Sequence, residues 1–193
     1  MKILHILDHS IPLHSGYTFR TRAILEQQRK MGWETAHITS TKHIAESSDE
    51  EMVDGLKFYR TQSNIGFLHN LPLVNQYLVV STLTKRLDHV IEKEKPDILH
   101  AHSPILNGMA ALRAGKKHDM PVVYECRAFW EDAAVDHGTS KEGGARYQLT
   151  RFLETRVFQQ ADAITTICDG LKKDIVARGV PAEKITIIPN AVD

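Results

Sequence analysis

The sequence predicts an α/β protein with an open, doubly wound, mainly parallel seven-stranded Rossmann-like sheet. Two observations support this fold class. Short apolar runs rich in β-branched residues alternate along the 193 residues with longer segments of helical composition, as in a sheet whose strands are joined by helices. The runs are apolar at consecutive positions, which is typical of parallel strands buried on both faces. Right-handed crossovers then place helices on each side of the sheet.

The elements can be assigned in chain order from this alternation. Strands are expected at residues 2–7, 35–40, 56–60, 97–101, 122–126, 163–167 and 185–188. Helices are expected at residues 17–31, 73–94, 106–118, 143–160 and 169–178. The longest helix is predicted by Leu, Val and Ile at near-helical spacing between Leu78 and Ile91, and Pro96 ends that pattern.

Polar and turn-forming residues separate the elements. Gly32 is expected to end the first helix in a left-handed conformation. The Glu-, Asp- and Ser-rich segment around residues 45–54 is expected to be a solvated loop. Asp169 is expected to cap the last helix, and Gly179 to stop it.

Composition excludes several classes of protein. The 24 Lys and Arg residues balance the 24 Asp and Glu residues, so the chain lacks the basic character of a general nucleic-acid binder. Cys126 and Cys168 are the only cysteines. Two thiols cannot form a disulfide scaffold, and both are expected to be small core residues. The N-terminus does not have the pattern of a signal peptide, and a cytoplasmic location is expected.

Four loops are expected on the rim at the carboxyl ends of the strands, where doubly wound sheets bind ligands. They are residues 8–16, 101–107, 126–138 and 167–170. Gly16 lies in the first, directly before a helix, where backbone N–H groups can approach a phosphate. Alternatively, this glycine only forms a turn. The dinucleotide fingerprint and the P-loop motif are both absent, which argues against an NAD enzyme or a P-loop hydrolase.

His100 and His102 end the fourth expected strand and point to the same face, with His102 nearer the rim. A histidine there can hydrogen-bond a substrate hydroxyl or respond to a nearby charge. The alternative is a structural histidine bonded to its neighbours. No third ligand of suitable spacing is apparent in the sequence, so a metal site is not expected.

Aromatic and charged residues follow the fifth expected strand, over residues 124–132. Aromatic rings can stack on sugar faces while carboxylates accept hydrogen bonds from hydroxyls, so the cluster suggests a carbohydrate pocket. Alternatively, its arginine and glutamates only pair with each other on the surface.

Three segments resemble the N-terminal half of family-4 glycosyltransferases of the GT-B fold: Ser15-Gly16, residues 96–103 and residues 187–193. In the last segment, Ala191 stands where these enzymes usually have glycine. The strings at residues 13–20 and 124–138 look more specifically like the exosortase-associated, exopolysaccharide-cluster branch.

The resemblance implies a retaining transferase that moves a sugar from a nucleotide-sugar donor to a saccharide or lipid-linked acceptor. It maps the active-site histidine to His102 and the donor-phosphate loop to Gly16. Contacts with the acceptor are expected from His14, Arg127, Glu131 and Asp132. The family uses no metal, and no cofactor is expected beyond the nucleotide sugar.

The resemblance also implies that residues 1–193 are an acceptor-side, Rossmann-like domain. The family's donor-binding domain, with its E-x7-E motif, is not in this sequence. The chain is therefore expected to be a truncated part of a larger enzyme, folded but without turnover alone.

Two other functions fit the same residues. A nucleotide-sugar 2-epimerase shares the two-domain architecture, and Glu125, Glu131 and Asp132 could supply its acid and base. A flavodoxin-like receiver or stand-alone ligand-binding module is the non-enzymatic alternative. A receiver needs an acidic cluster after the first strand and a lysine after the fifth, and Asp8 and Arg127 fit that pattern poorly.

Residues 61–84 contain no charged side chain. Polar residues interrupt the stretch too often for a membrane-spanning helix. It is expected either to face an acceptor lipid or the membrane surface, with Phe67 and Leu68 as the residues whose replacement tests this, or to cover the sheet or meet the donor-binding domain. Lys85, Arg86, Lys93 and Lys95 follow it and could meet anionic headgroups.

Overall fold

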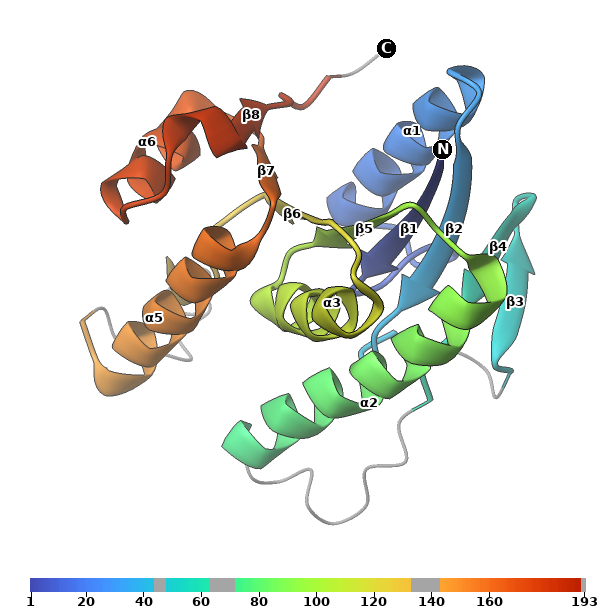
Figure 1. The fold of residues 1–193 in the computed structure, drawn as a ribbon, viewed down its shortest axis with the longest axis horizontal. Coiled ribbons are helices and arrows are strands. Elements are labelled where there is room, and N and C mark those ends of the chain that lie inside the picture. The colour runs from blue at the N-terminus through green and yellow to red at the C-terminus, as the bar shows by residue number, and fades with distance from the viewer. Residues whose placement is uncertain (44–47, 63–71, 133–142, 192–193) are drawn as a thin grey trace.

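The structure is a computed structural model that describes residues 1–43, 48–62, 72–132 and 143–191 (Figure 1). Its strands are β1 (Lys2–Leu7), β2 (Glu34–Thr39), β3 (Glu50–Val53), β4 (Leu56–Tyr59), β5 (Ile98–His102), β6 (Val122–Cys126), β7 (Ala163–Thr166) and β8 (Ile185–Ile187). Its α-helices are α1 (Gly16–Lys30), α2 (Pro72–Glu94), α3 (Ile105–His118), α5 (Ala145–Gln160) and α6 (Asp169–Ala177). A 3₁₀ turn, η2 (Ala182–Lys184), precedes β8.

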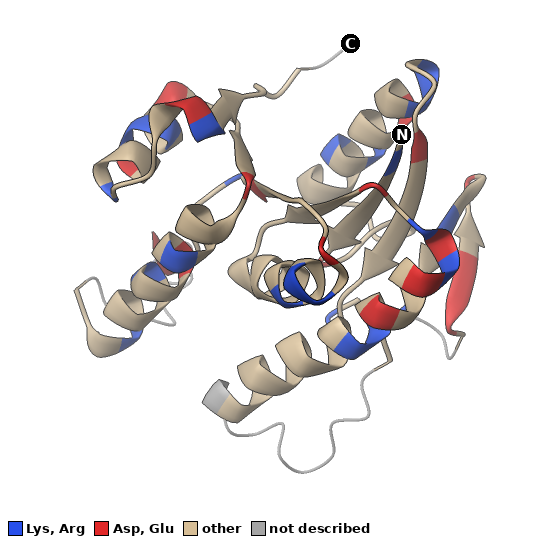
Figure 2. Ribbon diagram, in the orientation of Figure 1, with Lys and Arg blue, Asp and Glu red and all other residues tan. Residues whose placement is uncertain are grey.

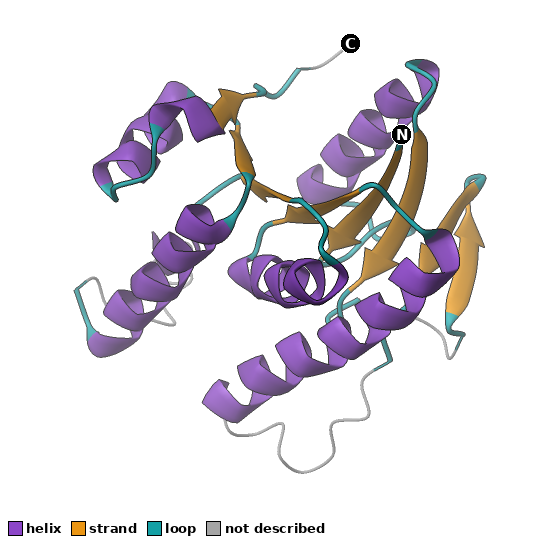
Figure 3. Ribbon diagram, viewed as in Figure 1, coloured by secondary structure: helices purple, strands orange, loops and turns teal. Residues whose placement is uncertain are grey.

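The strands form one sheet in the order β3-β4-β2-β1-β5-β6-β7-β8. Every pairing is parallel except β3 with β4. Helix α1 lies behind the sheet in Figure 1, and α2, α3 and α5 cover the front, while Figure 3 shows the alternation of strand and helix along the chain. The doubly wound α/β fold is therefore confirmed.

The prediction of seven strands was wrong, because the segment expected to be a solvated loop contains strand β3. The turn Asp54-Gly55 joins β3 to β4, and both residues have positive φ, 51° and 74°. An Asp-Gly pair with two positive φ angles is the preferred connection of a two-residue hairpin. The charged residues of β3 made this segment look like a loop. In the structure, Glu50 forms ion pairs at the sheet edge with Lys57 and Lys93.

The strand order reverses between β1 and β5. From β1 the chain builds one half of the sheet through β2 and β4, and then α2 returns it to β5 on the other side of β1. Such a reversal opens a crevice at the carboxyl ends of the two strands, where open α/β sheets bind ligands. The loop after Leu7 and the end of β5 at His102 meet at this point.

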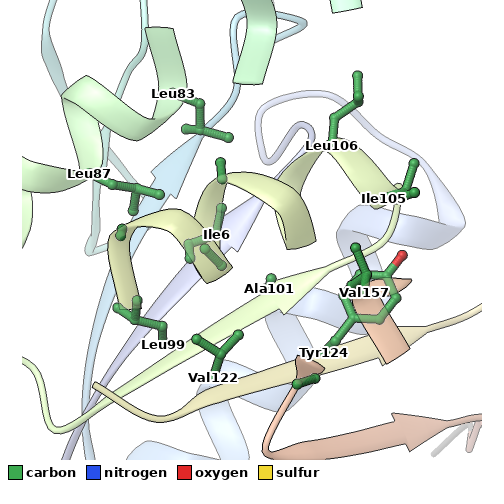
Figure 4. Close-up of a cluster of buried hydrophobic side chains, with 14 of the residues drawn as sticks. Ile6, Leu83, Leu87, Leu99, Ala101, Ile105, Leu106, Val122, Tyr124 and Val157 are labelled. Carbon is green, nitrogen blue, oxygen red and sulfur yellow. The ribbon is translucent and has the colours of Figure 1, made fainter. Parts of the chain in front are cut away.

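The main core lies between the sheet and helices α2, α3 and α5 (Figure 4). Leu83 and Leu87 of α2 are fully buried there, opposite strand residues such as Ala101. α3 approaches β6 closely, since a Cβ on Gly108 would lie only 3.0 Å from the Tyr124 ring. The buried face of α2 thus accounts for much of the uncharged stretch as sheet cover, whereas Phe67 and Leu68 lie outside the described residues.

The helix ends agree in part with the sequence analysis. Gly32 and Gly179 follow α1 and α6 with φ of 82° and 85°, as predicted. Asp169 was expected to cap α6 but is its first residue, and Cys168 occupies the cap position without a side-chain cap bond. Cys168 is exposed, so its assignment to the core was wrong, whereas Cys126 is buried.

Charged residues of both signs are mixed over the described surface, and the first half of α2 carries none (Figure 2). Among the described helices, none combines the length and the apolar character needed to cross a bilayer.

Candidate functional site

The candidate site lies at the carboxyl ends of β1, β5 and β6, beside the start of α1. Its centre is His102, the last residue of β5, whose side chain is fully buried. The ring nitrogen Nδ1 lies 2.7 Å from Glu125 Oε2 and 2.7 Å from Arg127 Nη2. The other nitrogen, Nε2, lies 2.9 Å from His5 Nδ1. Both nitrogens are therefore engaged by protein groups, and Arg127 and Glu125 mediate any influence of this ring on a ligand at the rim.

Two arginines flank the buried carboxylate of Glu125. Arg20 of α1 donates from Nε to Glu125 Oε1 at 2.9 Å, and Arg127 Nη2 lies 3.3 Å from Oε2. Arg127 also donates to the Tyr17 carbonyl and the Thr21 hydroxyl, both at 3.0 Å. Its guanidinium lies 4.3 Å from the centre of the Tyr17 ring. These bonds hold Arg127 in one orientation, half-buried beside the first turn of α1.

Burial and neighbouring charges shift the ionisation of this group. Burial alone would raise the pKa of Glu125, but His102 and Arg127 hold it well below its usual range. Burial lowers the pKa of His102, and the adjacent Glu125 opposes that shift. The site therefore holds an ionised carboxylate between two guanidinium groups, with a histidine beside it.

His5 of β1 joins His100 and His102 in a buried cluster, and one ligand atom from each lies within 4.8 Å of the others. The argument that no third ligand accompanies the histidine pair was therefore wrong. The geometry nevertheless fits poorly to a metal. His5 Nδ1 and His102 Nε2 are 2.9 Å apart in a hydrogen bond, and the His100 ring stacks on His102 with centroids 4.4 Å apart. Arg127 also places a positive charge against the cluster.

Gly16 is the first residue of α1, and a Cβ built there would meet nothing within 4 Å. Its φ is not among the positive values, so the backbone does not itself require glycine. Ser15 caps the helix by accepting from Thr18 N at 3.1 Å, and the first turn of α1 contains no acidic residue. The positive end of the helix thus faces open space, as an anion site requires.

The structure separates the expected acceptor residues. His14 and Asp132 are exposed, and Asp132 accepts a hydrogen bond from Tyr147 at 3.0 Å. Arg127 lies at the rim as expected. Glu131 does not: its side chain is fully buried and bonded to Arg178 at 2.6 Å. The first turn after β6 therefore directs Glu131 inward, and it is not presented at the rim.

Glu131 belongs instead to a separate buried cluster. Arg178 lies 4.0 Å from Glu154, and its guanidinium sits 3.9 Å from the centre of the Phe129 ring. Burial and the neighbouring Glu131 raise the pKa of Glu154 well above its usual range. One cation thus serves two buried carboxyl groups, and the cluster is closed to solvent.

The sequence analysis missed four residues of the site: His5, Tyr17, Arg20 and Gln28. His5 lies inside an apolar strand. Gln28 lies on the buried side of α1, but a single glutamine in a helix does not indicate a site. Arg20 is one of several arginines on α1. No local signal marks them, because only the pairing of β1 with β5 and the packing of α1 bring them to His102.

Comparison with known proteins agrees with this class of α/β fold. The Glycosyl transferase 4-like domain family matches residues 15–191. The chain therefore belongs to that family. The finer assignment to the exosortase-associated branch is not tested by this match.

Individual relatives are distant and longer. A GDP-mannose-dependent alpha-mannosyltransferase of Mycobacterium tuberculosis (strain CDC 1551 / Oshkosh) is 22% identical over 94% of this chain and 45% of its own length. Sucrose-phosphate synthase from Thermosynechococcus elongatus shares the fold with a TM-score of 0.71 and 14% identity, over 100% of this chain and 48% of its own. UDP-GlcNAc 2-epimerase from Neisseria meningitidis bound to UDP-GlcNAc has a TM-score of 0.62 and 16% identity, over 97% and 46%. The chain spans about half the length of each.

Proposed function

We propose that this domain is the acceptor side of a retaining glycosyltransferase that transfers a sugar from a nucleotide-sugar donor to a saccharide or lipid-linked acceptor. The reaction would serve exopolysaccharide or glycoconjugate synthesis. One observation carries the proposal: the open N-terminus of α1 at Gly16 lies directly beside the fixed guanidinium of Arg127. A helix N-terminus and an arginine together favour a diphosphate and the charge that develops on it as the sugar leaves.

The donor diphosphate would approach Gly16 because its Cα leaves the backbone N–H groups accessible. A side chain at that position would occupy the space instead. Positive groups beside the start of α1 include the helix end itself and two arginines, Arg20 and Arg127. Because these groups can neutralise part of the leaving charge, we propose a reaction without a metal ion or any further cofactor.

The acceptor would lie over His14 and Asp132, which are exposed, and beside Arg127, whose side chain is 12% exposed. His102 is proposed to act at the reacting centre through the groups that its ring holds, Arg127 and Glu125. In the full-length protein, His102→Ala should reduce turnover by ~10²-fold or more. Turnover is expected to need both this domain and a donor-binding domain of the size found in its longer relatives.

The experiment is a transfer assay with the full-length parent protein. Nucleotide sugars, GDP-mannose among them because a curated relative is named for it, are incubated with saccharide and lipid-linked acceptors in EDTA. Product with the donor's anomeric configuration would support a metal-independent retaining transferase. An inverted product, or strict dependence on a divalent metal, would contradict it.

The second candidate function is a nucleotide-sugar 2-epimerase, which the shared fold with UDP-GlcNAc 2-epimerase favours. Of the three carboxylates first considered for its acid and base, Glu131 is buried away from the rim, and Glu125 is held between arginines. An epimerase would interconvert the free nucleotide sugar without any acceptor. Epimerised donor in the acceptor-free control would therefore replace the transferase proposal with this one.

A separate proposal is that the protein binds the surface of an anionic membrane and reaches a lipid-linked acceptor there. The described part of the uncharged stretch contributes Tyr77 of α2, which is 61% exposed beside Arg113. Co-sedimentation of the full-length protein with phosphatidylglycerol vesicles at low salt tests it, with Tyr77→Ser expected to weaken binding. Absence of vesicle binding by the parent would end this proposal and leave the transferase proposal standing.

A further inference from the structure

A chain of hydrogen bonds crosses the buried face of the site from helix α1 to Arg127. Gln28, on the buried side of α1, places its amide oxygen 2.8 Å from His5 Nε2. His5 Nδ1 lies 2.9 Å from His102 Nε2. The far nitrogen of His102 then meets Arg127 at 2.7 Å. All three side chains before the arginine are buried, so water cannot replace any of these partners.

The chemistry of the groups along this chain fixes the direction of the bonds between Gln28 and His102. An amide oxygen can only accept, so His5 must carry its proton on Nε2. A neutral His5 then has a bare Nδ1, which accepts from His102 Nε2–H. The Nδ1 of His102 faces both Arg127, which can only donate, and the Glu125 carboxylate, which can only accept. One arrangement of protons therefore satisfies the bonds from Gln28 through His5 to His102 Nε2, while Nδ1 can be bare or protonated.

We propose that Gln28 and His5 are positioning residues that hold the proton of His102 on Nε2, so that its Nδ1 is the nitrogen presented to Glu125 and Arg127. The proton that His102 can gain or lose is then the one on Nδ1. When Nδ1 is bare it accepts from Arg127, and when it is protonated it donates to Glu125 Oε2 at 2.7 Å. The bond to His5 is kept in both states.

Other groups around the ring are consistent with this arrangement. His102 is faced by His5 from β1, His100 from β5, Tyr17 and Arg20 from α1, and Glu125 and Arg127 from the end of β6. His100 Nε2 is buried without a hydrogen-bond partner, so that ring does not compete for either nitrogen of His102. Burial lowers the pKa of His5 well below its usual range, which keeps it neutral and its Nδ1 bare.

The consequence for the reaction rests on the proposed function, but the proton positions do not. Because the bond to His5 holds the proton on Nε2, His102 can gain or lose a proton only at Nδ1. That nitrogen lies next to Glu125 and Arg127, which approach the rim. The sequence alone could not suggest this, because Gln28, His5 and His102 lie on three different elements.

The test is a two-bond ¹H–¹⁵N correlation spectrum of the 193-residue chain labelled in its histidines, at pH 7. Signals of His5 and His102 are assigned with the variants His5→Gln and His102→Gln. We expect His5 to be neutral and protonated on Nε2, and His102 to carry a proton on Nε2 whether or not Nδ1 is also protonated. A neutral His102 protonated on Nδ1 would overturn the proposal, and so would a shift of either ring to a metal-bound value on addition of Zn²⁺.

Variants of the glutamine extend the test. Gln28→Leu removes the acceptor and should move the proton positions of both His5 and His102, while Gln28→Glu keeps an acceptor and should preserve them. Gln27→Leu, the same change at an exposed neighbour, is the matched control and should leave the spectrum unchanged. An unchanged His102 spectrum in folded Gln28→Leu would contradict the role of Gln28. Should Gln28→Leu fail to fold, the wild-type and Gln28→Glu spectra still decide. None of these readouts depends on turnover, so a failure of the transferase proposal would be seen separately.

Discussion

Arg20 and Glu125, 105 residues apart in the sequence, form an ion pair with 2.9 Å between Nε and Oε1. The same guanidinium donates to the Ile188 carbonyl at 2.9 Å and to Asn190 Oδ1 at 2.9 Å. Arg20 therefore ties the segment after β8 to the carboxylate at the centre of the site. One side chain of α1 thus joins residues 188–190 to the site, and the position of that segment depends on it.

Replacing this arginine should release the segment after β8. In Arg20→Met, amide exchange of Ile188, whose N–H is bonded to the Thr166 carbonyl at 2.7 Å, should accelerate roughly tenfold, because about 1.4 kcal/mol of local stability is lost. Hydrogen-exchange NMR measures it. Arg22→Met on the same helix removes only exposed ion pairs and should have little effect. An Ile188 amide that exchanges at the wild-type rate in Arg20→Met would refute the role of the arginine.

Neutralising two adjacent carboxylates after β6, Glu131 and Asp132, should have unequal effects on stability. Glu131→Gln leaves the buried Arg178 without its closest anion, so we expect the free energy of unfolding to fall by about 3 kcal/mol. Asp132→Asn changes an exposed group and should stay within about 0.5 kcal/mol of wild type. Urea unfolding of both variants measures the difference. Equal effects of the two substitutions would show that Glu131 is not held by Arg178.

Stability should decrease with acid because of the buried histidines. Burial lowers the pKa of His37 to about 4 and that of His100 to about 3, below the value of about 6.5 in the unfolded chain. The unfolded state then binds more protons below that pH, so the stabilisation is complete above pH ~6.5 and is lost as the pH falls toward the folded-state pKa values. The loss from His37 alone is on the order of 3 kcal/mol.

The variant His100→Phe tests how much of the pH dependence of stability comes from His100. It keeps a ring stacked on His102 and removes a buried nitrogen that has no partner. Unfolding in urea between pH 7 and pH 4.5 should show a shallower loss of stability than in wild type. His89→Phe, at an exposed histidine of α2, is the control and should follow the wild-type curve. A parallel curve for His100→Phe would contradict the attribution.

The parts of the fold that local patterns determine could be predicted from the sequence. The parallel strands are continuous apolar runs, and Gly32 and Gly179 stop their helices where only a left-handed residue fits. Strand β3 was missed because its stability comes from the Asp54-Gly55 turn and from charge pairing across strands, and not from an apolar face.

The candidate site could be predicted only for residues at the ends of strands. His102 ends β5 and Arg127 directly follows β6, so both could be placed on the rim. Glu131 could not be told from Asp132, because the direction of a side chain in the turn after β6 depends on Arg178, contributed from the end of α6. The partners of His102 come from other elements and are set by tertiary packing alone.

At Gly16 the proposed donor binding can be tested separately from folding. A Cβ there would touch no atom within 4 Å, and the residue has no positive φ, so a larger side chain is compatible with the fold. What a side chain would obstruct is the space in front of the N–H groups of α1, where the proposed diphosphate would lie.

We therefore expect Gly16→Val in the full-length protein to weaken nucleotide-sugar binding by at least about tenfold, since one blocked phosphate contact corresponds to roughly 1.4 kcal/mol or more. The free energy of unfolding should stay within about 0.5 kcal/mol of wild type. Titration calorimetry with the donor and urea unfolding measure the two quantities. Gly32→Val is the control with the reverse expectation: its φ of 82° makes valine destabilising, while donor binding by the folded protein is retained. A Gly16→Val protein that loses stability and keeps its donor affinity would show that this glycine serves only the turn into α1.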